Sequence, residues 1–284
     1  MTVLEVIQKS AEFLARKDVE SPRLQTELLL AHLLKMPRMK LYLNFDRTLS
    51  DAELDAVRAS VRRRGQREPL QHIIGSTSFC GLEMSVNRNV LVPRPETELL
   101  AEAGWEFLST LNSQPPTALD FGTGSGCIAI ALAVKSQLAR IVALDASAHA
   151  LVVAKENAAR NRVGERIEFL RGNDLTALAV GSRFDLIVSN PPYIPSAEIA
   201  TLQTEVRDFD PREALDGGAD GLAFYHLLAA QAGECLRPGG KIMLEFGDGQ
   251  AAAIQGLFAA AGWSVEAVRA DYAQRDRILI ARRD

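Results

Sequence analysis

Apolar residues in the first third of the chain recur at helical spacing. One such stripe predicts a first helix: Leu4, Ile7, Ala11 and Leu14. Ser21 followed by Pro22 is typical of a cap and a first-turn proline, so a second amphipathic helix is expected from Leu24 to Leu34. The sequence therefore opens with two helices joined by a short connection.

A third helix is indicated by the residues that should begin it. Ser50 and Glu53 have capping-box spacing, and Leu49 and Leu54 have the positions of a hydrophobic staple. We expect this helix to start at about Asp51 and to run into Arg62-Arg63-Arg64. Cations suit a helix carboxyl end, so this basic run is interpreted as solvated, with an acidic partner such as RNA as the alternative.

The apolar pattern changes to period two from Ile73. Phe79 precedes a predicted turn at Cys80-Gly81, and Leu82, Met84 and Val86 then alternate with polar residues. This predicts a β-hairpin. We expect a helical domain over residues 1–72, a hairpin linker over 73–92 and a second domain over 93–284.

Strands and helices alternate in the second domain. The proline-rich segment Leu91–Glu98 opens a helix that contains Leu99, Leu100 and Trp105, and Pro115-Pro116 then precedes the first strand. Strands are expected at 118–121, 141–144, 167–170, 184–189, 242–246, 264–268 and 277–281, with helices at 128–134 and 151–159. The pattern predicts an α/β fold with a Rossmann-like, doubly wound sheet, whose ligands bind at the carboxyl ends of the strands.

Composition narrows the classes of protein. The 284 residues are 47% hydrophobic and 24% charged, with a formal charge of −4, which argues against a broadly basic nucleic-acid surface. Three scattered cysteines and four scattered histidines lack metal-ligand spacing, so no metal is expected. Neither a signal segment nor a membrane-spanning apolar stretch is recognisable, and a cytoplasmic monomer is expected.

A glycine-rich turn follows the first strand of the predicted sheet. Gly122, Gly124 and Gly126 let backbone approach a ligand, and Asp145, about twenty residues later, is placed to bind a ribose. A dinucleotide is one interpretation. However, the spacing is G-x-G-x-G, and Asp120 before it disfavours a pyrophosphate and favours a cationic ligand. S-adenosylmethionine, with its ribose, sulfonium and ammonium, fits these features.

A second motif, Asn190-Pro191-Pro192-Tyr193, ends the predicted strand 184–189. The prolines have no N–H to continue a ladder, which leaves the carbonyls of Asn190 and Pro191 free to accept. With the Asn190 side-chain oxygen they form a group of acceptors beside the ring of Tyr193. Such a group suits a planar NH2 donor, either a carboxamide or the exocyclic amine of a base; an ordinary strand-ending turn is the alternative.

The chain resembles a known family through these motifs taken together. They are Asp120-Phe121-Gly122-Thr123-Gly124-Ser125-Gly126, Asp145, Asn190-Pro191-Pro192-Tyr193, LVPRPETE at 91–98 and RDFDPREAL at 207–215. In this combination, and with a helical front region, the chain is similar to class I S-adenosylmethionine-dependent methyltransferases that modify glutamine N5 of peptide chain release factors.

The resemblance implies roles for individual residues. Residues 120–126 would contact the donor, Asp145 its ribose, and Asn173 or Asp174 its adenine. Asn173 stands where many relatives have an acid, so the adenine contact is the one departure from the pattern. Asn190 and the Pro191 carbonyl would hold the substrate amide, with Pro192 and Tyr193 beside it; Asn190, Pro191 and Tyr193 are the predicted catalytic residues.

The implied reaction is methylation of the glutamine in the release-factor GGQ motif, with S-adenosyl-L-homocysteine as product. Region 1–72 would dock the release factor, and no direct nucleic-acid substrate is expected. A glutamine methyltransferase of a ribosomal protein and a DNA adenine-N6 methyltransferase are the alternatives, since both present a planar amine or amide. A noncatalytic binding module that keeps the donor fold is the alternative outside enzymes.

Overall fold

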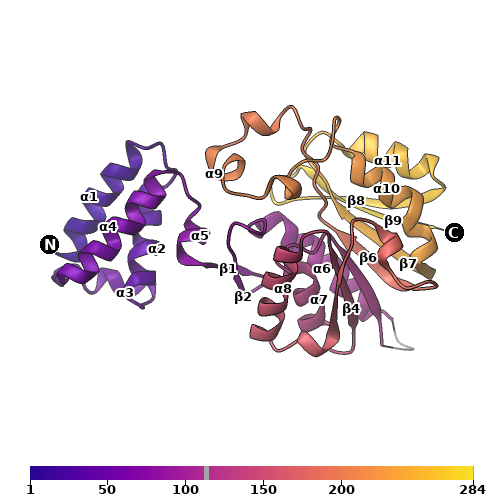
Figure 1. The fold of residues 1–284 in the computed structure, drawn as a ribbon, viewed down its shortest axis with the longest axis horizontal. Coiled ribbons are helices and arrows are strands. Elements are labelled where there is room, and N and C mark those ends of the chain that lie inside the picture. Colours follow the sequence, from indigo (N-terminus) through magenta and orange to yellow (C-terminus); the bar gives the residue numbers. More distant parts are fainter. Residues whose placement is uncertain (112–114, 284) are drawn as a thin grey trace. The chain divides into compact units, whose positions relative to one another are not determined.

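The structure, a computed structural model, describes residues 1–111 and 115–283. The chain divides into two compact units, which we call the helical unit and the sheet unit. The helical unit is Met1–Ser76 together with Gln203–Phe209, and the sheet unit is Thr77–Leu202 together with Asp210–Asp284. Figure 1 shows the elements of each. Positions 112–114 and 284 of the predicted second domain lie outside the described residues.

The helical unit contains these helices: α1 (Val3–Ala15), α2 (Pro22–Leu33), α3 (Arg38–Tyr42), α4 (Asp51–Gly65), α5 (Leu70–Ile74) and α9 (Thr204–Arg207). The predicted start of α4 is confirmed. The Glu53 backbone N–H donates to Ser50 Oγ at 3.3 Å, and the Ser50 N–H donates to Glu53 Oε2 at 2.9 Å. This reciprocal box satisfies two donors that a helix start leaves unpaired.

Apolar side chains from α1, α2 and α4 form the core of the helical unit. On α1 the buried residues are Val3, Val6, Ile7 and Leu14. Leu4 and Ala11, which belong to the predicted stripe, are only partly buried. The helix is therefore present as predicted, but its buried face is rotated slightly from the expected one.

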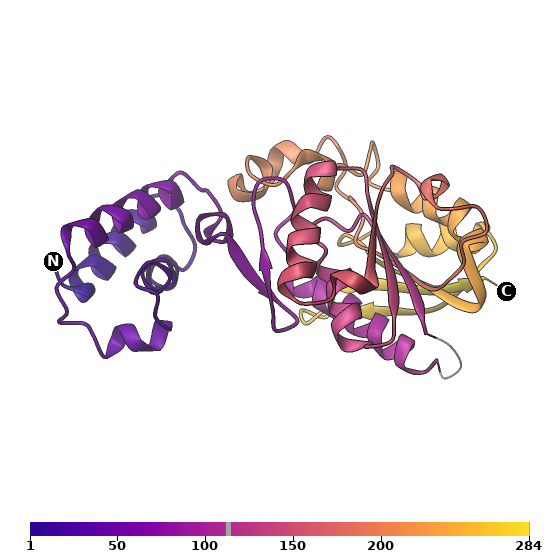
Figure 2. The same cartoon turned by 60° about the horizontal axis from the view of Figure 1, so that its bottom comes forward.

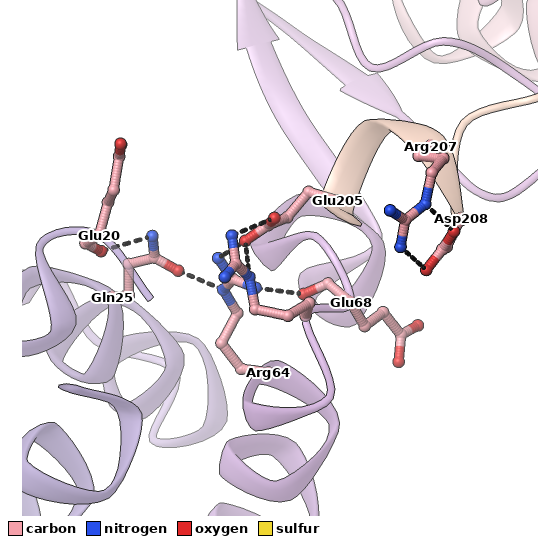
Figure 3. Close-up of polar contacts among 8 residues, drawn as sticks. Glu20, Gln25, Arg64, Glu68, Glu205, Arg207 and Asp208 are labelled. Atoms are coloured by element: carbon pink, nitrogen blue, oxygen red, sulfur yellow. Dashed lines mark hydrogen bonds and ion pairs between the residues drawn. The ribbon is translucent and has the colours of Figure 1, made fainter. Parts of the chain in front are cut away.

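The segment Gln203–Phe209 joins the helical unit through an ion-pair cluster (Figure 3). Arg64 Nη2 lies 2.7 Å from Glu205 Oε1, and Arg67 Nη2 lies 2.6 Å from Glu205 Oε2. Burial raises the pKa of Glu205, but hydrogen bonds from the two guanidinium groups lower it by more than burial raises it. The pKa of Glu205 therefore lies below its usual range. The carboxylate is therefore held in its charged form.

This cluster corrects the prediction that the run Arg62–Arg64 is a solvated helix end. Arg62 and Arg63 are exposed, but only 3% of Arg64 is exposed. Its acidic partner is Glu205, 141 positions later in the same chain. Local sequence pattern contains no information about a partner at that distance.

The hairpin is present, but it begins later than predicted. Ile73 and Ile74 belong to α5, which starts after Pro69 and ends at Gly75 with φ +84°. The strands are β1 (Ser76–Phe79) and β2 (Leu82–Ser85). Cys80 and Gly81 between them both have positive φ, as in a two-residue turn between antiparallel strands. The period-two pattern therefore applies from Ser76, and its extension back to Ile73 was wrong.

The sheet unit is built on seven strands: β3 (Thr117–Phe121), β4 (Arg140–Asp145), β5 (Ile167–Arg171), β6 (Phe184–Ser189), β7 (Leu236–Glu245), β8 (Trp263–Ala270) and β9 (Asp276–Arg283). Their order is β5-β4-β3-β6-β7-β9-β8. The five strands from β5 to β7 pair in parallel, while β9 is antiparallel to both β7 and β8. The predicted Rossmann-like fold is confirmed, and its carboxyl-terminal hairpin makes the sheet mixed.

Helices cover both faces of this sheet (Figure 1, Figure 2). They are α6 (Pro95–Ser109), α7 (Cys127–Lys135), α8 (Ala148–Arg160), α10 (Ala223–Gln231) and α11 (Ala251–Ala260). Neighbouring strand residues enter opposite cores: Ala118 packs with residues of α6 and α7, and Leu119 packs with residues of α10 and α11. This accounts for the nearly continuous apolar strands in the sequence, since both faces are buried.

Candidate active site

The two sequence motifs follow adjacent strands of the sheet. β3 pairs in parallel with β6, with Asp120 opposite Val188, so both motifs leave the sheet at the same edge. At that edge, Ser189 Oγ donates a hydrogen bond to the Phe121 carbonyl at 2.6 Å. β4 lies on one side of β3 and β6 on the other, so the strand order reverses at β3. Doubly wound sheets bind ligands at such a reversal.

The glycine turn presents backbone rather than side chains. Gly122 and Gly124 have φ of +72° and +54°, and a Cβ added at either would meet no atom within 4 Å. Gly126 differs, because its Cβ would lie 3.1 Å from the Ala154 side chain in α8. The first two glycines therefore leave space for a ligand, and the third permits close helix packing.

Asp120 lies beneath the turn and is fully buried. Its Oδ2 accepts from Thr123 Oγ1 at 2.6 Å and from the Ala129 N–H at 3.0 Å. Burial raises its pKa to about 7, and those two hydrogen bonds lower it. Oδ1 is also buried and accepts from none of the residues that the structure describes. Asp120 thus stabilises the glycine turn through its hydrogen bonds to Thr123 and Ala129.

The other predicted side chains of the turn point into the protein. Phe121 lies in the core on the α10 face, and Thr123 and Ser125 are 4% and 3% exposed. A donor molecule would therefore meet the backbone of these three residues. The fit of this turn to S-adenosylmethionine rests on open backbone at Gly122 and Gly124.

Asp145 ends β4 beside the glycine turn. Its Oδ2 accepts from the Gly124 N–H and its Oδ1 from the Ser147 N–H, both at 2.8 Å. Burial raises the pKa of Asp145, and the two backbone hydrogen bonds lower it. Because each carboxylate oxygen has two lone pairs, both oxygens can also accept from ribose hydroxyls. The side chain is fixed in a geometry that suits that ligand.

Asn173 and Asp174 follow β5 at the same edge of the sheet. Asp174 caps a short turn: its Oδ1 accepts from the Thr176 N–H at 2.8 Å and from the Thr176 hydroxyl at 2.5 Å. These bonds lower the pKa of Asp174. Asn173 is exposed. Both bonds to Asp174 go to Oδ1, so they leave its Oδ2, like the exposed side chain of Asn173, for a ligand. An adenine contact by either residue stays a prediction.

The amide of Asn190 is held by a residue of the LVPRPETE segment. Asn190 Nδ2 donates to Thr97 Oγ1, in the first turn of α6, at 3.1 Å. In this orientation the other amide atom of Asn190, Oδ1, is the one that can accept a hydrogen bond from a ligand. Tyr193 is mostly buried and its pKa is raised to about 12, so the phenol is neutral. That Asn190 Oδ1 and the Tyr193 ring together receive a planar amide stays a prediction.

Neighbouring residues also contact the backbone of the segment Asn190–Tyr193. Gln250 Nε2 donates to the Tyr193 carbonyl at 3.0 Å, while its Oε1 accepts from the Gly247 N–H at 2.9 Å. Gly217 packs so closely that a Cβ there would lie 2.8 Å from the Pro192 carbonyl oxygen. The Tyr193 carbonyl is thus held by a hydrogen bond from Gln250, and the Pro192 carbonyl lies against Gly217, where a larger residue would not fit.

Sequence reasoning missed several residues that support this site: Thr97, Glu245 and Gln250. Only Thr97 carried a signal, since it lies within LVPRPETE. Glu245 and Gln250 lie more than fifty positions after Asn190, and only the fold brings them to it.

Comparison with known proteins decides the family. A family model described as the PrmC N-terminal domain matches residues 5–75, and one described as the methyltransferase small domain matches residues 102–206. The chain is 46% identical over 264 residues to the release factor glutamine methyltransferase of Geobacter sulfurreducens, covering 92% of this chain and 90% of that relative. The chain belongs to the release factor glutamine methyltransferase family.

Another release factor glutamine methyltransferase, from Chlorobaculum tepidum, is 44% identical over 284 residues, covering 98% of this chain and 96% of the relative. A methyltransferase of known structure from Pyrococcus furiosus has a TM-score of 0.52 at 22% identity, over 72% of this chain and 90% of that one. It supports the fold alone. The resemblance stated from sequence is confirmed, and so is the predicted enzyme class, a protein-glutamine methyltransferase.

Two features are absent from the residues that the structure describes. Over residues 1–111 and 115–283, no helix is both long and apolar enough to cross a membrane. Within the same ranges, no three His, Cys, Asp or Glu side chains are grouped as a metal ion would require.

Proposed function

We propose that this chain methylates the side-chain amide nitrogen, N5, of the glutamine in the GGQ motif of peptide chain release factors. S-adenosylmethionine is the donor and S-adenosyl-L-homocysteine the product. The observation that carries the proposal is the orientation of Asn190, whose Nδ2 is engaged by Thr97 and whose Oδ1 is left to accept from a guest NH2 group. The reaction supports translation termination.

The residues around the glycine turn fit the donor. The open backbone at Gly122 and Gly124 suits its methionine end, and the Asp145 carboxylate suits its ribose hydroxyls. Asn173 is available to its adenine. When bound, S-adenosylmethionine supplies an electrophilic methyl group on a positively charged sulfur.

The acceptors at Asn190 and Pro191 address the main chemical difficulty. A carboxamide nitrogen is a poor nucleophile, because its lone pair is delocalised into the carbonyl. If Asn190 Oδ1 and the Pro191 carbonyl accept its two N–H groups, electron density at nitrogen rises and the lone pair is held in one direction. Positioning of this kind contributes up to roughly 7–11 kcal/mol, so no strong base is needed before transfer. Attack of the nitrogen breaks the bond between the methyl group and sulfur, S-adenosyl-L-homocysteine leaves, and the amide nitrogen then loses one proton to water or a nearby acceptor.

The substrate protein must be recognised beyond a single amide. We propose that region 1–72 docks the release factor, because one glutamine side chain offers too little contact for specificity. Release factors act in the cytoplasm, and we place this reaction there.

The direct test is to incubate the purified chain with isotopically labelled donor and, separately, with a release factor, ribosomal proteins and DNA. We expect label on the release factor, mapped by mass spectrometry to the amide nitrogen of the GGQ glutamine. A release factor with asparagine in place of that glutamine is the matched control and should stay unlabelled. Label confined to a ribosomal protein or to DNA adenine would overturn the proposal.

A further inference from the structure

An asparagine amide has a donor end and an acceptor end of nearly the same shape. A half-turn of the Asn190 amide would exchange Oδ1 for Nδ2 at the substrate, and a substrate NH2 group would then meet another donor. The partner seen in the structure, the Thr97 hydroxyl, can both donate and accept. Thr97 alone therefore does not select the productive orientation.

The selection comes from a third residue, Glu245, at the end of β7. β7 pairs in parallel with β6, with Leu244 opposite Ser189, so Glu245 lies beside Asn190 at the same edge of the sheet. Glu245 and Thr97 are 2% and 3% exposed, and the Thr97 hydroxyl lowers the pKa of Glu245 as a hydrogen-bond donor does. An ionised carboxylate can only accept, so in this pair Thr97 is the donor. The lone pair of Thr97 is then what remains for Asn190, and only Nδ2 can donate to it, as the structure shows.

We propose that Glu245 and Thr97 are positioning residues for methyl transfer: Glu245, acting through the Thr97 hydroxyl, holds the Asn190 amide with Oδ1 toward the substrate nitrogen. This inference rests on the proposed function, because it assigns the substrate an NH2 group to be accepted. It gives the LVPRPETE segment a chemical role in addition to opening helix α6.

The burial of Glu245 is hard to explain by stability. Glu245 is almost fully buried, and its Oε2 accepts from none of the described residues. A buried carboxylate with an unsatisfied oxygen is costly, and a neutral residue of the same shape would be tolerated better. A residue retained at such a cost is a candidate for a functional role.

The surroundings of Glu245 place its titration within the range of ordinary assays. Burial raises its pKa to about 7, and the Thr97 hydrogen bond and the charge of Arg277 lower it. Arg94 pairs with Asp210, whose pKa is raised to about 6 by burial, and Arg277 pairs with Asp271. The charged or titratable side chains that face Glu245 are Arg94, Glu96, Tyr193, Tyr225 and Arg277.

The direction of the pH effect follows from which group holds the proton. Above about pH 7 Glu245 is ionised and accepts from Thr97, which keeps Asn190 in its productive orientation. Below that pH the protonated carboxyl can donate to Thr97, which can then donate to Asn190 Oδ1. The rate of methyl transfer should therefore fall as the pH drops through about 7.

The experiment measures kcat, the KM for release factor, donor affinity and the pH profile for the wild type, Thr97→Val, Thr97→Ser and Glu245→Gln. We expect Thr97→Val to lower kcat between about 10-fold and 100-fold, and Thr97→Ser to restore it. Glu245→Gln should lower kcat and abolish the acid limb near pH 7, because glutamine does not titrate. Donor affinity, measured by calorimetry, should stay within about twofold of the wild type, since neither residue lies at the glycine turn.

Thermal melting separates this role from a structural one. Glu245→Gln should melt at the same or a higher temperature than the wild type, since it removes a buried charge. Glu168→Gln, at an exposed position of β5, is the matched control and should leave every measurement unchanged. If Glu245→Gln does not fold, the Thr97→Val and Thr97→Ser pair still decides the question.

Failure of the proposed function can be distinguished from failure of the roles assigned to Glu245 and Thr97. A wild type that leaves release factor unlabelled would refute the proposed function. A wild type that labels it, with Glu245→Gln keeping the same kcat and the same acid limb, would refute this inference alone. Equal kcat for Thr97→Val and Thr97→Ser would refute it as well.

Discussion

Ser189 Oγ lies 2.6 Å from the carbonyl oxygen of Phe121 and donates a hydrogen bond to it. Each of these residues directly precedes one of the two functional turns. Because Ser189 is fully buried, the bond is shielded from water. It couples the position of the acceptor motif to that of the glycine turn, so the proposed substrate site and the proposed donor site share one support.

Replacing Ser189 with alanine tests this coupling. The change leaves one hydrogen bond of a buried carbonyl unmade, and we expect it to lower the free energy of unfolding by about 1–3 kcal/mol. We also expect kcat to fall, since the two turns are no longer held together. Urea denaturation and a methylation assay measure the two effects. Ser109→Ala, at an exposed helix end, should change neither; equal effects of both variants would contradict the coupling.

Removing the Asn190 side chain should separate chemistry from donor binding. In Asn190→Ala the side-chain acceptor is lost, while the glycine turn and Asp145 remain. We expect turnover to be abolished and the donor dissociation constant, measured by calorimetry, to change little. Asn89→Ala, at an exposed position, is the control. Normal methylation by Asn190→Ala would defeat the assigned role.

Asp145 should act on donor affinity. Its two oxygens fix the Gly124 and Ser147 N–H groups and remain able to accept from a ribose. Asp145→Ala removes both functions, and we expect donor affinity to fall about 10-fold to 100-fold, equivalent to about 1.4–2.7 kcal/mol. Calorimetry measures it. Asp276→Ala, at an exposed position, should bind donor normally, and unaltered affinity in Asp145→Ala would exclude the ribose contact.

The ion-pair cluster of the helical unit predicts a stability difference between two nearby acids (Figure 3). Glu205→Ala leaves buried Arg64 without its carboxylate, and we expect a loss of about 3 kcal/mol in the free energy of unfolding. Asp208 pairs with Arg207 at the exposed surface, so Asp208→Ala should have no measurable effect. Urea denaturation of the full chain compares them, and similar midpoints for the two variants would contradict the prediction.

The same cluster has a defined pH dependence. The folded pKa of Glu205 is lowered, so its stabilising contribution is complete above the ordinary glutamate pKa of about 4.3 and is lost as the pH falls through the folded value. The difference in stability between the wild type and Glu205→Ala should therefore shrink in acid.

Local chemistry accounts for the parts of the fold that the sequence predicted. The capping box at Ser50 and Glu53 depends on two residues three positions apart. The glycine turn depends on five consecutive residues, with Asp145 about twenty positions after the turn. The boundary error at Ile73 has a similar local origin. Pro69 and Gly75 start and stop a short helix, but the apolar pair inside it matches strand periodicity as well as helix periodicity.

Contacts between distant parts of the sequence could not be predicted in this way. Arg64 is buried because Glu205 reaches it, and the Asn190 amide is held by Thr97, 93 positions earlier in the chain. No periodicity or spacing connects these positions. The motif residues could be proposed as site residues from the sequence, whereas the residues that contact them could be found only in the fold.

The segment Gln203–Phe209 has a practical consequence for dissecting the protein. The chain passes from one unit to the other after Ser76, after Leu202 and after Phe209, so the helical unit is not one continuous stretch of sequence. A separately expressed fragment that ends at Ser76 would carry Arg64 and Arg67 without the carboxylate of Glu205. The stability of such a fragment would understate the stability of the same helices in the intact chain.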